Sequence, residues 1–312
     1  MNDSDMIDEE FLSELDGSLT LRRAIKLYEL VVMPARNLAA RTREEYGKDL
    51  RLFASWCDRR GLLRVDQITL PVLEAYQAEM DAHGYASASR QRKTYALRGL
   101  LAFFFGHGVI RQNIGRRLIP PLRVRKEPRF LTRAEYGALK QACHDSPRDS
   151  AIVEVLLQTG MRRGELARLT LDDVLELPER LTQSPDGIGL IQIRRRGGDV
   201  AMPLNFRACR AIQRYLAERP SGPSRALFLS RSGTALSPRA ILNLIKHYAA
   251  EIGLSGVGVH TLRHTHGTHH VLQGTDLSVI KENMGHADIS TTEQYVVLAG
   301  KARRKALQDH AL

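Results

Sequence analysis

Apolar residues along the first third of the chain have the spacing of helices. They recur at intervals of three and four residues, which predicts helices at 19–33, 42–59, 71–84 and 87–105. Thr42, followed three residues later by Glu45, predicts a capping box for the second helix. Pro71 suits the first turn of the third helix, and Ser87 or Ser89 is expected to cap the fourth. Short connections between these stretches predict a small helical bundle.

The rest of the chain has helical spacing that one pair of strands interrupts. Thr132 with Glu135 predicts another capping box, which opens a helix to about residue 144. Further helices are expected at 147–158, from Arg162 onward, at 206–218, 238–251, 260–273 and 276–284, and around Tyr295. Residues 189–194 and 200–204 alternate as strands do, with a glycine-rich turn between them. Phe228 and Leu229 are expected to add a third short strand, so the pattern predicts a mainly α fold with a small antiparallel β-sheet.

Prolines mark a boundary between the two parts. Pro120, Pro121 and Pro128 cannot continue a helix and hold the backbone extended. A chain of 312 residues is long enough for two domains. We expect an acidic N-terminal tail at 1–17, a helical domain at 18–119, a linker at 120–129, a second domain at 130–300 and a C-terminal tail at 301–312.

The net charge of +11 predicts a polyanionic partner. Residues 82 to 126 include no acidic residue but many basic ones: Arg90, Arg92, Lys93, Arg98, Arg111, Arg116, Arg117, Arg123, Arg125 and Lys126. The alternative, a solvated helix face, usually mixes charges of both signs. We therefore expect this helix to lie against DNA, with Arg90, Arg92 and Lys93 in contact with the phosphates.

The cysteines and the N-terminus predict a cytoplasmic protein. Cys57, Cys143 and Cys209 are scattered and odd in number, which is typical of reduced core thiols and not of a disulfide framework or metal cluster. The acidic, polar start of the chain does not resemble a signal peptide. No apolar run in the sequence is long enough to span a bilayer.

The residues that carry chemistry gather between positions 260 and 295. His260 and Arg263 are three residues apart in a helical stretch and share one face of it. Gly285 and His286 follow a second amphipathic stretch, and Tyr295 comes nine residues later. Cationic side chains, imidazoles and a phenol suit the binding of a phosphate and attack on its phosphorus atom.

This run resembles the catalytic box of the tyrosine recombinases, the family of phage integrases and Xer-like enzymes, in which His-x-x-Arg, Gly-His and a nucleophilic Tyr follow in this order. The stretch TGMRRGEL, from Thr159 to Leu166, is similar to the family's first arginine box. The resemblance covers nearly the whole chain. It implies a SAM-like N-terminal domain that binds DNA and a tyrosine-recombinase catalytic domain. The implied activity is site-specific cutting and rejoining of DNA through a 3′-phosphotyrosyl intermediate, without a metal, ATP or another cofactor.

The resemblance assigns catalytic roles to Arg162, Arg195, His260, Arg263, His286 and Tyr295. Two of these, Arg162 and Arg263, would grip the phosphate with their forked guanidinium groups, and the adjacent Arg163 is the alternative to Arg162. Tyr295 would be the nucleophile. His260 would accept its proton or donate to the phosphate, and His286 would hydrogen-bond the scissile phosphate. Glu165 would orient the arginines without reacting.

One expected residue is replaced. The family's β-hairpin carries a lysine that protonates the leaving oxygen, whereas this hairpin has no lysine and Arg195 stands at that place. A guanidinium is a poor proton donor because its pKa is about 12 or higher. Arg195 is therefore expected to stabilise charge, while water or a histidine gives the proton.

The resemblance also implies partners. These are double-stranded DNA and further copies of the chain, which form a tetramer on two duplexes and pass their C-terminal tails to neighbouring protomers. A second recombinase or an accessory protein is a further possible partner. The target site and the biological task, whether integration, excision, dimer resolution or transposition, are left open.

Three alternatives remain at this point. A relaxing type IB topoisomerase shares the tyrosine chemistry, and a DNA-binding regulator of the same fold would keep the fold with weak or no cleavage. A zinc site is the third, because His260 with His264 and His266 with His270 have ligand-like spacing. Against zinc, the glutamate of the HExxH motif is missing and the sequence has no cysteine or carboxylate next to these histidines.

Overall fold

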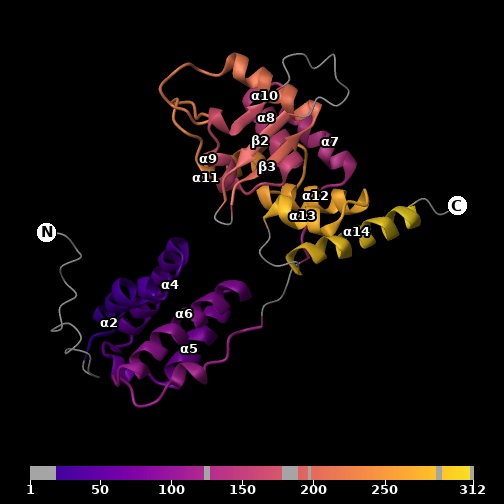
Figure 1. The fold of residues 1–312 in the computed structure, drawn as a ribbon. Coiled ribbons are helices and arrows are strands. Elements are labelled where there is room, and N and C mark those ends of the chain that lie inside the picture. Colours follow the sequence, from indigo (N-terminus) through magenta and orange to yellow (C-terminus); the bar gives the residue numbers. More distant parts are fainter. Residues whose placement is uncertain (1–18, 123–126, 178–188, 196–197, 286–289, 310–312) are drawn as a thin grey trace. The chain divides into compact units, whose positions relative to one another are not determined.

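The computed structural model describes residues 19–122, 127–177, 189–195, 198–285 and 290–309. The chain divides into two compact units, Met1–Lys126 and Glu127–Leu312, which are described separately (Figure 1). Within the described residues, no helix combines the length and the apolar composition that crossing a membrane requires.

Unit 1 is a bundle of helices, as its apolar spacing predicts. Its elements are α2 (Leu21–Leu27), a π-helical turn (Tyr28–Val32), α3 (Met33–Ala35), α4 (Ala40–Asp58), a 3₁₀ turn (Val65–Gln67), α5 (Leu70–Ala82), α6 (Ser87–Gly106) and a 3₁₀ turn (Ile114–Arg116). Where one helix is predicted at 19–33, the chain forms α2, the π-helical turn and α3 in direct succession. Pro71 lies in the first turn of α5, as predicted.

The core of unit 1 is aromatic at its centre. Phe53 and Trp56 of α4 stack on each other with ring centroids 6.2 Å apart, and both contact Tyr76 of α5. Gly99 of α6 lies against Tyr28, where an added Cβ would come within 2.5 Å of the phenol oxygen. A glycine in mid-helix therefore makes room for a buried tyrosine.

The predicted caps of two helices in unit 1 are wrong. α4 begins at Ala40 with Ala39 as N-cap, so Thr42 lies inside the helix. The residues before Thr42 favour helix enough to extend α4 by part of a turn. Glu45 is then free to pair with Arg92 of α6 at 2.6 Å. α6 begins at Ser87 itself, behind the N-cap Ala86.

A buried ion pair joins α4 to α6. Lys93 donates to Asp49 at 2.6 Å, and both side chains are almost fully covered. Arg92 also contacts Asp49, at 3.1 Å. Lys93 and Asp49 are both shielded from water, so neither charge is stabilised without the other. The pair therefore holds α4 against α6.

Unit 2 is mostly helical, as predicted, and contains a small sheet. Its elements are α7 (Arg133–Ala142), α8 (Pro147–Thr159), α9 (Arg163–Arg168), a 3₁₀ turn (Leu171–Asp173), β1 (Val174–Glu176), β2 (Gly189–Ile193), β3 (Val200–Leu204), α10 (Phe206–Glu218), α11 (Pro238–Glu251), α12 (Val259–Leu272), α13 (Leu277–Met284) and α14 (Ser290–Asp309). The capping box of Thr132 with Glu135 at the start of α7 is confirmed.

Within the described residues, the sheet has the order β1-β2-β3 and is antiparallel throughout. The predicted hairpin is confirmed, with Ile191 opposite Met202. The third strand is Val174–Glu176, so the prediction of a strand at Phe228 and Leu229 is wrong. Leu229 forms only an isolated bridge to Ala235, because the chain turns back too soon for a ladder.

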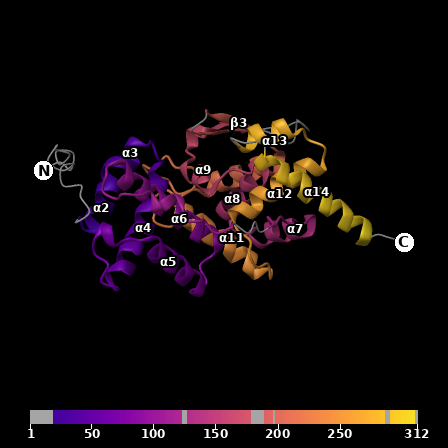
Figure 2. The same cartoon turned by 90° about the horizontal axis from the view of Figure 1, so that it is seen from below.

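The hydrophobic interior of unit 2 has two parts. The main core surrounds α8, which is buried along most of its length and is covered by α10, α12 and the sheet. A smaller cluster contains Ile280, Met284, Tyr295 and Leu298, with Phe130 against it. This cluster joins α12, α13 and α14, which lie side by side in both views (Figure 1, Figure 2).

Replacing Asp49 by alanine tests the buried ion pair. We expect the free energy of unfolding of unit 1 to fall by about 3–5 kcal/mol, because Lys93 would stay buried without its counter-charge. Urea unfolding followed by Trp56 fluorescence measures this, since Trp56 is the chain's single tryptophan and lies in unit 1. The matched control is Asp58→Ala, which breaks an exposed pair with Arg22 and should cost at most about 1 kcal/mol. Equal losses in both variants would contradict this account.

Candidate active site

Arg162 is held at the junction of α8 and α9. α8 ends at Gly160, whose φ of +59° is the left-handed conformation that glycine favours. Arg162 follows in an extended conformation as the N-cap of α9. Its backbone N–H and its Nη1 each donate to Glu165 at 2.8 Å. The buried Glu165 therefore orients Arg162, whose side chain remains 45% exposed.

α12 carries the second arginine. Arg263 is buried, with Nη1 donating to the carbonyl oxygen of Gly160 at 2.7 Å and Nη2 to that of Met284 at 2.5 Å. Burial, and then repulsion from Arg162, lowers the pKa of Arg263 to about 10. The side chain thus stays cationic at neutral pH, although it has left water.

The last turn of α13 is where the arginines meet. Residues 282–285, here called the α13 carbonyl turn, accept hydrogen bonds from three guanidinium groups among the described residues: Arg195 donates to Glu282 and Asn283, Arg263 to Met284, and Arg162 to Gly285. The C-terminus of a helix carries a partial negative charge and favours cations. The turn therefore holds positive charges together that would otherwise repel one another.

Tyr295 lies beside this group, on α14. Its side chain is buried, and the ring rests on Gly267 of α12, where a Cβ would come within 2.7 Å of it. The ring of His264 is 5.7 Å away between centroids. Burial raises the pKa of Tyr295, while the positive charge of Arg263 opposes the rise. The phenol is therefore protonated at neutral pH and needs a base to become a nucleophile.

His260 is exposed, as Arg162 is. Partial loss of solvation lowers the pKa of His260, and the positive charges of Arg263, Arg163 and Arg162 lower it further. The imidazole is therefore neutral at pH 7 and can accept a proton. Arg163, the alternative to Arg162, opens α9 and lies close enough to repel a charged His260.

The other histidines of α12 bind neighbouring groups. His266 donates from Nδ1 to the carbonyl oxygen of Leu157 at 3.1 Å, and burial lowers the pKa of His266 to about 3. Nε2 of His269 donates to the carbonyl oxygen of Leu131 at 3.1 Å. In the part of the chain that the structure describes, no group of three or more histidine, cysteine or carboxylate side chains is arranged to hold a metal ion. The structure gives the zinc alternative no support.

The structure brings together Arg162, Arg195, Arg263 and Tyr295, with His260 at the edge of the group. His286 lies outside the described residues. Sequence reasoning missed Gly267 and the α13 carbonyl turn. A glycine in the middle of α12 was the available signal for Gly267, because glycine is unfavourable in a helix unless something packs closely against it.

The residues expected to contact DNA in unit 1 form ion pairs within the bundle. Arg90 pairs with Asp81 at 2.7 Å, and Arg92 pairs with Glu45. Lys93 is buried against Asp49, so a phosphate contact from Lys93 would require that pair to break. The prediction for Lys93 is therefore in conflict with its position.

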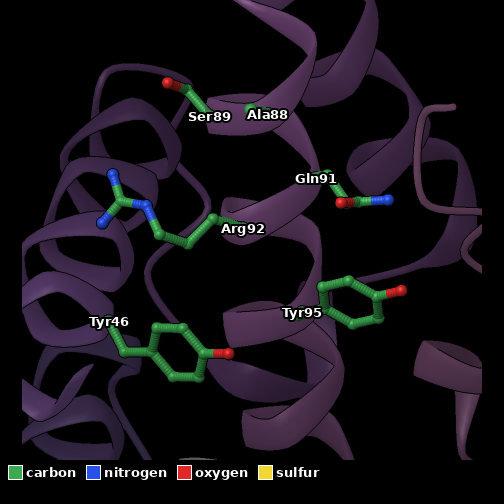
Figure 3. Close-up of a pocket in the computed structure, with 6 residues that line it drawn as sticks. All are labelled: Tyr46, Ala88, Ser89, Gln91, Arg92 and Tyr95. Carbon is green, nitrogen blue, oxygen red and sulfur yellow. The ribbon is translucent and has the colours of Figure 1, made fainter. Parts of the chain in front are cut away.

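A hollow of about 410 Å³ opens beside Arg92 on the surface of unit 1. Figure 3 shows Tyr46 of α4 on one side and residues from the first turns of α6 on the other: Ala88, Ser89, Gln91, Arg92 and Tyr95. Tyr95 is 46% exposed. Aromatic, amide and guanidinium groups thus line an accessible surface.

Comparison with known proteins identifies the family of this chain. The model of the phage integrase family matches residues 129–301, and the model of the N-terminal SAM-like domain of phage integrases matches residues 25–107. The chain is 34% identical to the tyrosine recombinase XerD of Pseudomonas aeruginosa, over 88% of this chain and 91% of that protein. It is 31% identical to the tyrosine recombinase XerC of Roseiflexus castenholzii, over 84% of this chain and 85% of that protein.

Solved structures show the same fold. A lambda integrase dimer bound to a COC′ core site superposes with a TM-score of 0.71 at 19% identity, over 94% of this chain and 82% of that one. The recombinase XerH in a post-cleavage complex with its difH substrate superposes with a TM-score of 0.68 at 20% identity, over 98% and 90%. On the strength of the family models and the XerC and XerD relatives, the chain belongs to the phage integrase family and is a tyrosine recombinase, a site-specific enzyme that breaks and rejoins DNA.

Proposed function

We propose that this recombinase cuts one DNA strand at a time with Tyr295 as the nucleophile. The phenol oxygen attacks the scissile phosphorus, a 3′-phosphotyrosyl bond forms, and the 5′-oxygen leaves as a hydroxyl. Attack by a 5′-hydroxyl on that bond reverses the step and rejoins the strand. The observation that carries this proposal is the meeting of Arg162, Arg263 and Tyr295 at one place, from three separate helices.

The arginines hold the phosphate in this mechanism. The guanidinium group of Arg162 is exposed, and its hydrogen bond to Glu165 fixes its orientation. Arg263 is buried behind it and contributes fixed positive charge in a region of low dielectric, where that charge acts strongly. Oriented cations of this kind stabilise the extra negative charge that develops on the non-bridging oxygens.

His260 accepts the proton of the phenol. It is neutral at pH 7, and it lies on the same face of α12 as Arg263. His286 hydrogen-bonds the phosphate, which rests on the resemblance of its Gly-His pair to the family motif. Since Tyr295 is only 1% exposed here, its phenol must swing out from Gly267 before it reaches a duplex.

The substrate is double-stranded DNA, which unit 1 grips through its basic surface. We assign the grip to residues 18–119, the chemistry to 130–300 and contacts between protomers to 301–312, with 120–129 as the linker. Arg90 and Arg92 are the proposed phosphate contacts. The hollow beside Arg92 would then face a groove of the DNA duplex. A DNA substrate places the enzyme's action in the cytoplasm.

The assembly is a homotetramer on two duplexes, because an exchange of two duplexes needs four cuts. A solved relative, the lambda integrase, forms a tetramer on a Holliday junction. A second recombinase or an accessory protein would enter as a heterologous partner of the same ring. The comparisons favour neither a type IB topoisomerase nor a regulator without cleavage, since the curated relatives are named recombinases.

Covalent trapping tests the nucleophile. Nicked duplexes from DNA flanking the gene are incubated with the protein, and denaturing gels are used to detect a protease-sensitive adduct. We expect the adduct with the wild-type protein and none with Tyr295→Phe, because the phenol oxygen forms the bond. Tyr248→Phe is the matched control and should retain the adduct, since Tyr248 donates to Asp149, which pairs with Arg148 and not with Arg162 or Arg263. An adduct in Tyr295→Phe would exclude Tyr295.

The pH dependence of cleavage tests His260. The pKa of His260 is lowered, so the base form persists at neutral pH and is lost only below the ordinary imidazole value of about 6.5. At protein concentrations well below saturation, the rate reports the free enzyme. We expect it to be level from pH 8 to about 6.5 and to fall below that. An acid limb centred above pH 7 would show that His260 is not the base.

Deleting residues 301–312 tests the tail. The variant should bind DNA and form the Tyr295 adduct, because the buried residues Tyr295 and Leu298 that anchor α14 remain. Strand exchange should fall to background, since the tail is the proposed link between protomers. Native gels and a two-plasmid recombination assay separate these steps. Full recombination by the truncated protein would contradict the role of the tail.

A further inference from the structure

We infer that Arg195 is a positioning residue that joins the β2–β3 hairpin to the α13 carbonyl turn, and that it does not protonate the leaving oxygen. This inference rests on the proposed tyrosine chemistry. It concerns the position where this chain departs from the family, because the hairpin lacks a lysine.

Two nitrogens of the Arg195 guanidinium donate to the α13 carbonyl turn. Nη1 donates to the carbonyl oxygen of Glu282 at 3.2 Å, and Nη2 donates to that of Asn283 at 2.8 Å. Nε lies 3.6 Å from Glu165. The side chain is only 7% exposed, so Nη1 and Nη2 have protein acceptors rather than water, while Nε is buried near the charge of Glu165 without a hydrogen bond to it.

The fit to the turn is close. Gly285 has a φ of +61°, and a Cβ at this position would come within 2.9 Å of Nη1 and 3.1 Å of Cδ of Arg195. The arginine therefore lies flat against a glycine that caps α13 in the left-handed conformation. Two separate nitrogens reach two successive carbonyl oxygens from the fixed fork of a guanidinium, a geometry that the single nitrogen of a lysine does not reproduce.

The chemistry of the group points the same way. Burial lowers the pKa of Arg195, but the negative charge of Glu165 opposes this shift. A guanidinium with a carboxylate beside it keeps its proton, and arginine is effectively always charged in proteins. Arg195 is therefore a fixed positive charge without a proton to transfer.

Arg195 acts through Arg162. Both contact the same oxygen of Glu165, Arg162 at 2.8 Å and Arg195 at 3.6 Å. Both also bond the α13 carbonyl turn, Arg195 at Asn283 and Arg162 at Gly285. Loss of Arg195 would remove two of the hydrogen bonds that hold the turn and one of the two cations beside Glu165. The two groups that aim Arg162 would then be held less firmly.

The neighbouring Arg194 provides a matched control. It lies on the same hairpin with the same charge, but its side chain is 60% exposed and pairs with Asp173 at 2.9 Å. The buried Asp173 keeps its two hydrogen bonds from Thr170 when Arg194 is replaced. Arg194→Gln removes one charge from the hairpin without touching the α13 carbonyl turn. It should cleave at close to the wild-type rate.

The test compares two nicked substrates that differ in one atom. One has the natural 5′-oxygen at the scissile phosphate, and the other has sulfur in that bridging position. A thiolate leaves without protonation, because a thiol is far more acidic than an alcohol. Loss of a general acid is therefore rescued by sulfur, whereas loss of positioning is not.

We expect Arg195→Ala to form the Tyr295 adduct roughly a hundredfold more slowly on both substrates, the scale of a displacement of about 1 Å. Arg195→Lys should be similarly slow on the oxygen substrate, since the single nitrogen of a lysine does not reproduce the two-nitrogen fork that fits the α13 carbonyl turn. Near-wild-type cleavage of the sulfur substrate by Arg195→Ala, or of the oxygen substrate by Arg195→Lys, would overturn the inference. A wild-type rate for Arg195→Ala on oxygen would also overturn it.

Two further measurements separate this result from other failures. DNA binding and thermal unfolding of Arg195→Ala should match those of Arg194→Gln, which shows that the variant is folded. An unfolded Arg195→Ala would leave Arg195→Lys as the deciding variant. If the wild-type protein forms no adduct on either substrate, the proposed function fails, and that outcome differs from slow cleavage by the variant alone.

Discussion

The structure of unit 2 depends on how three guanidinium groups share a small volume. Arg162, Arg195 and Arg263 repel one another, and the pKa of Arg263 is lowered first by burial and then by this repulsion. The α13 carbonyl turn offsets it with the negative end of a helix, and Glu165 adds one full negative charge. Residues from α9, α12 and the hairpin are thus held by a fourth element that contributes only backbone oxygens.

The proposed nucleophile, Tyr295, packs against α12, the helix that also carries Arg263. α12 presents Arg263 and, one turn later, Gly267 under the ring of Tyr295. The cluster around Tyr295 is separate from the main core. Among the described residues it comprises Ile280, Met284, Tyr295 and Leu298, with Phe130, Val271 and Leu277 packed against it. A small, separate cluster favours local opening, which the proposed swing of Tyr295 requires.

The sequence predicted what depends on local order. The chain positions of the catalytic motif, the capping box of Thr132 with Glu135 and the hairpin all follow from residues close together in the chain. The cap at Thr42 failed because α4 starts earlier, and the side chain of Glu45 binds a residue 47 positions away. Lys93 was predicted to contact phosphate for the same reason, since its partner Asp49 lies 44 positions earlier on another helix.

At the site, the contacts of Arg195 could not be predicted from the sequence either. Its neighbours in sequence identify it as the replacement for a lysine, but its acceptors lie 87 and 88 residues further on. Only the folded structure shows whether the residue at position 195 can act as a proton donor or is a cation that binds the C-terminus of α13. A missing acid is compatible with the chemistry, because the phenol releases one proton for each proton that the leaving oxygen takes up. The reaction therefore needs a route for that proton and no net supply of protons, and a fixed cation at Arg195 is sufficient for the charge.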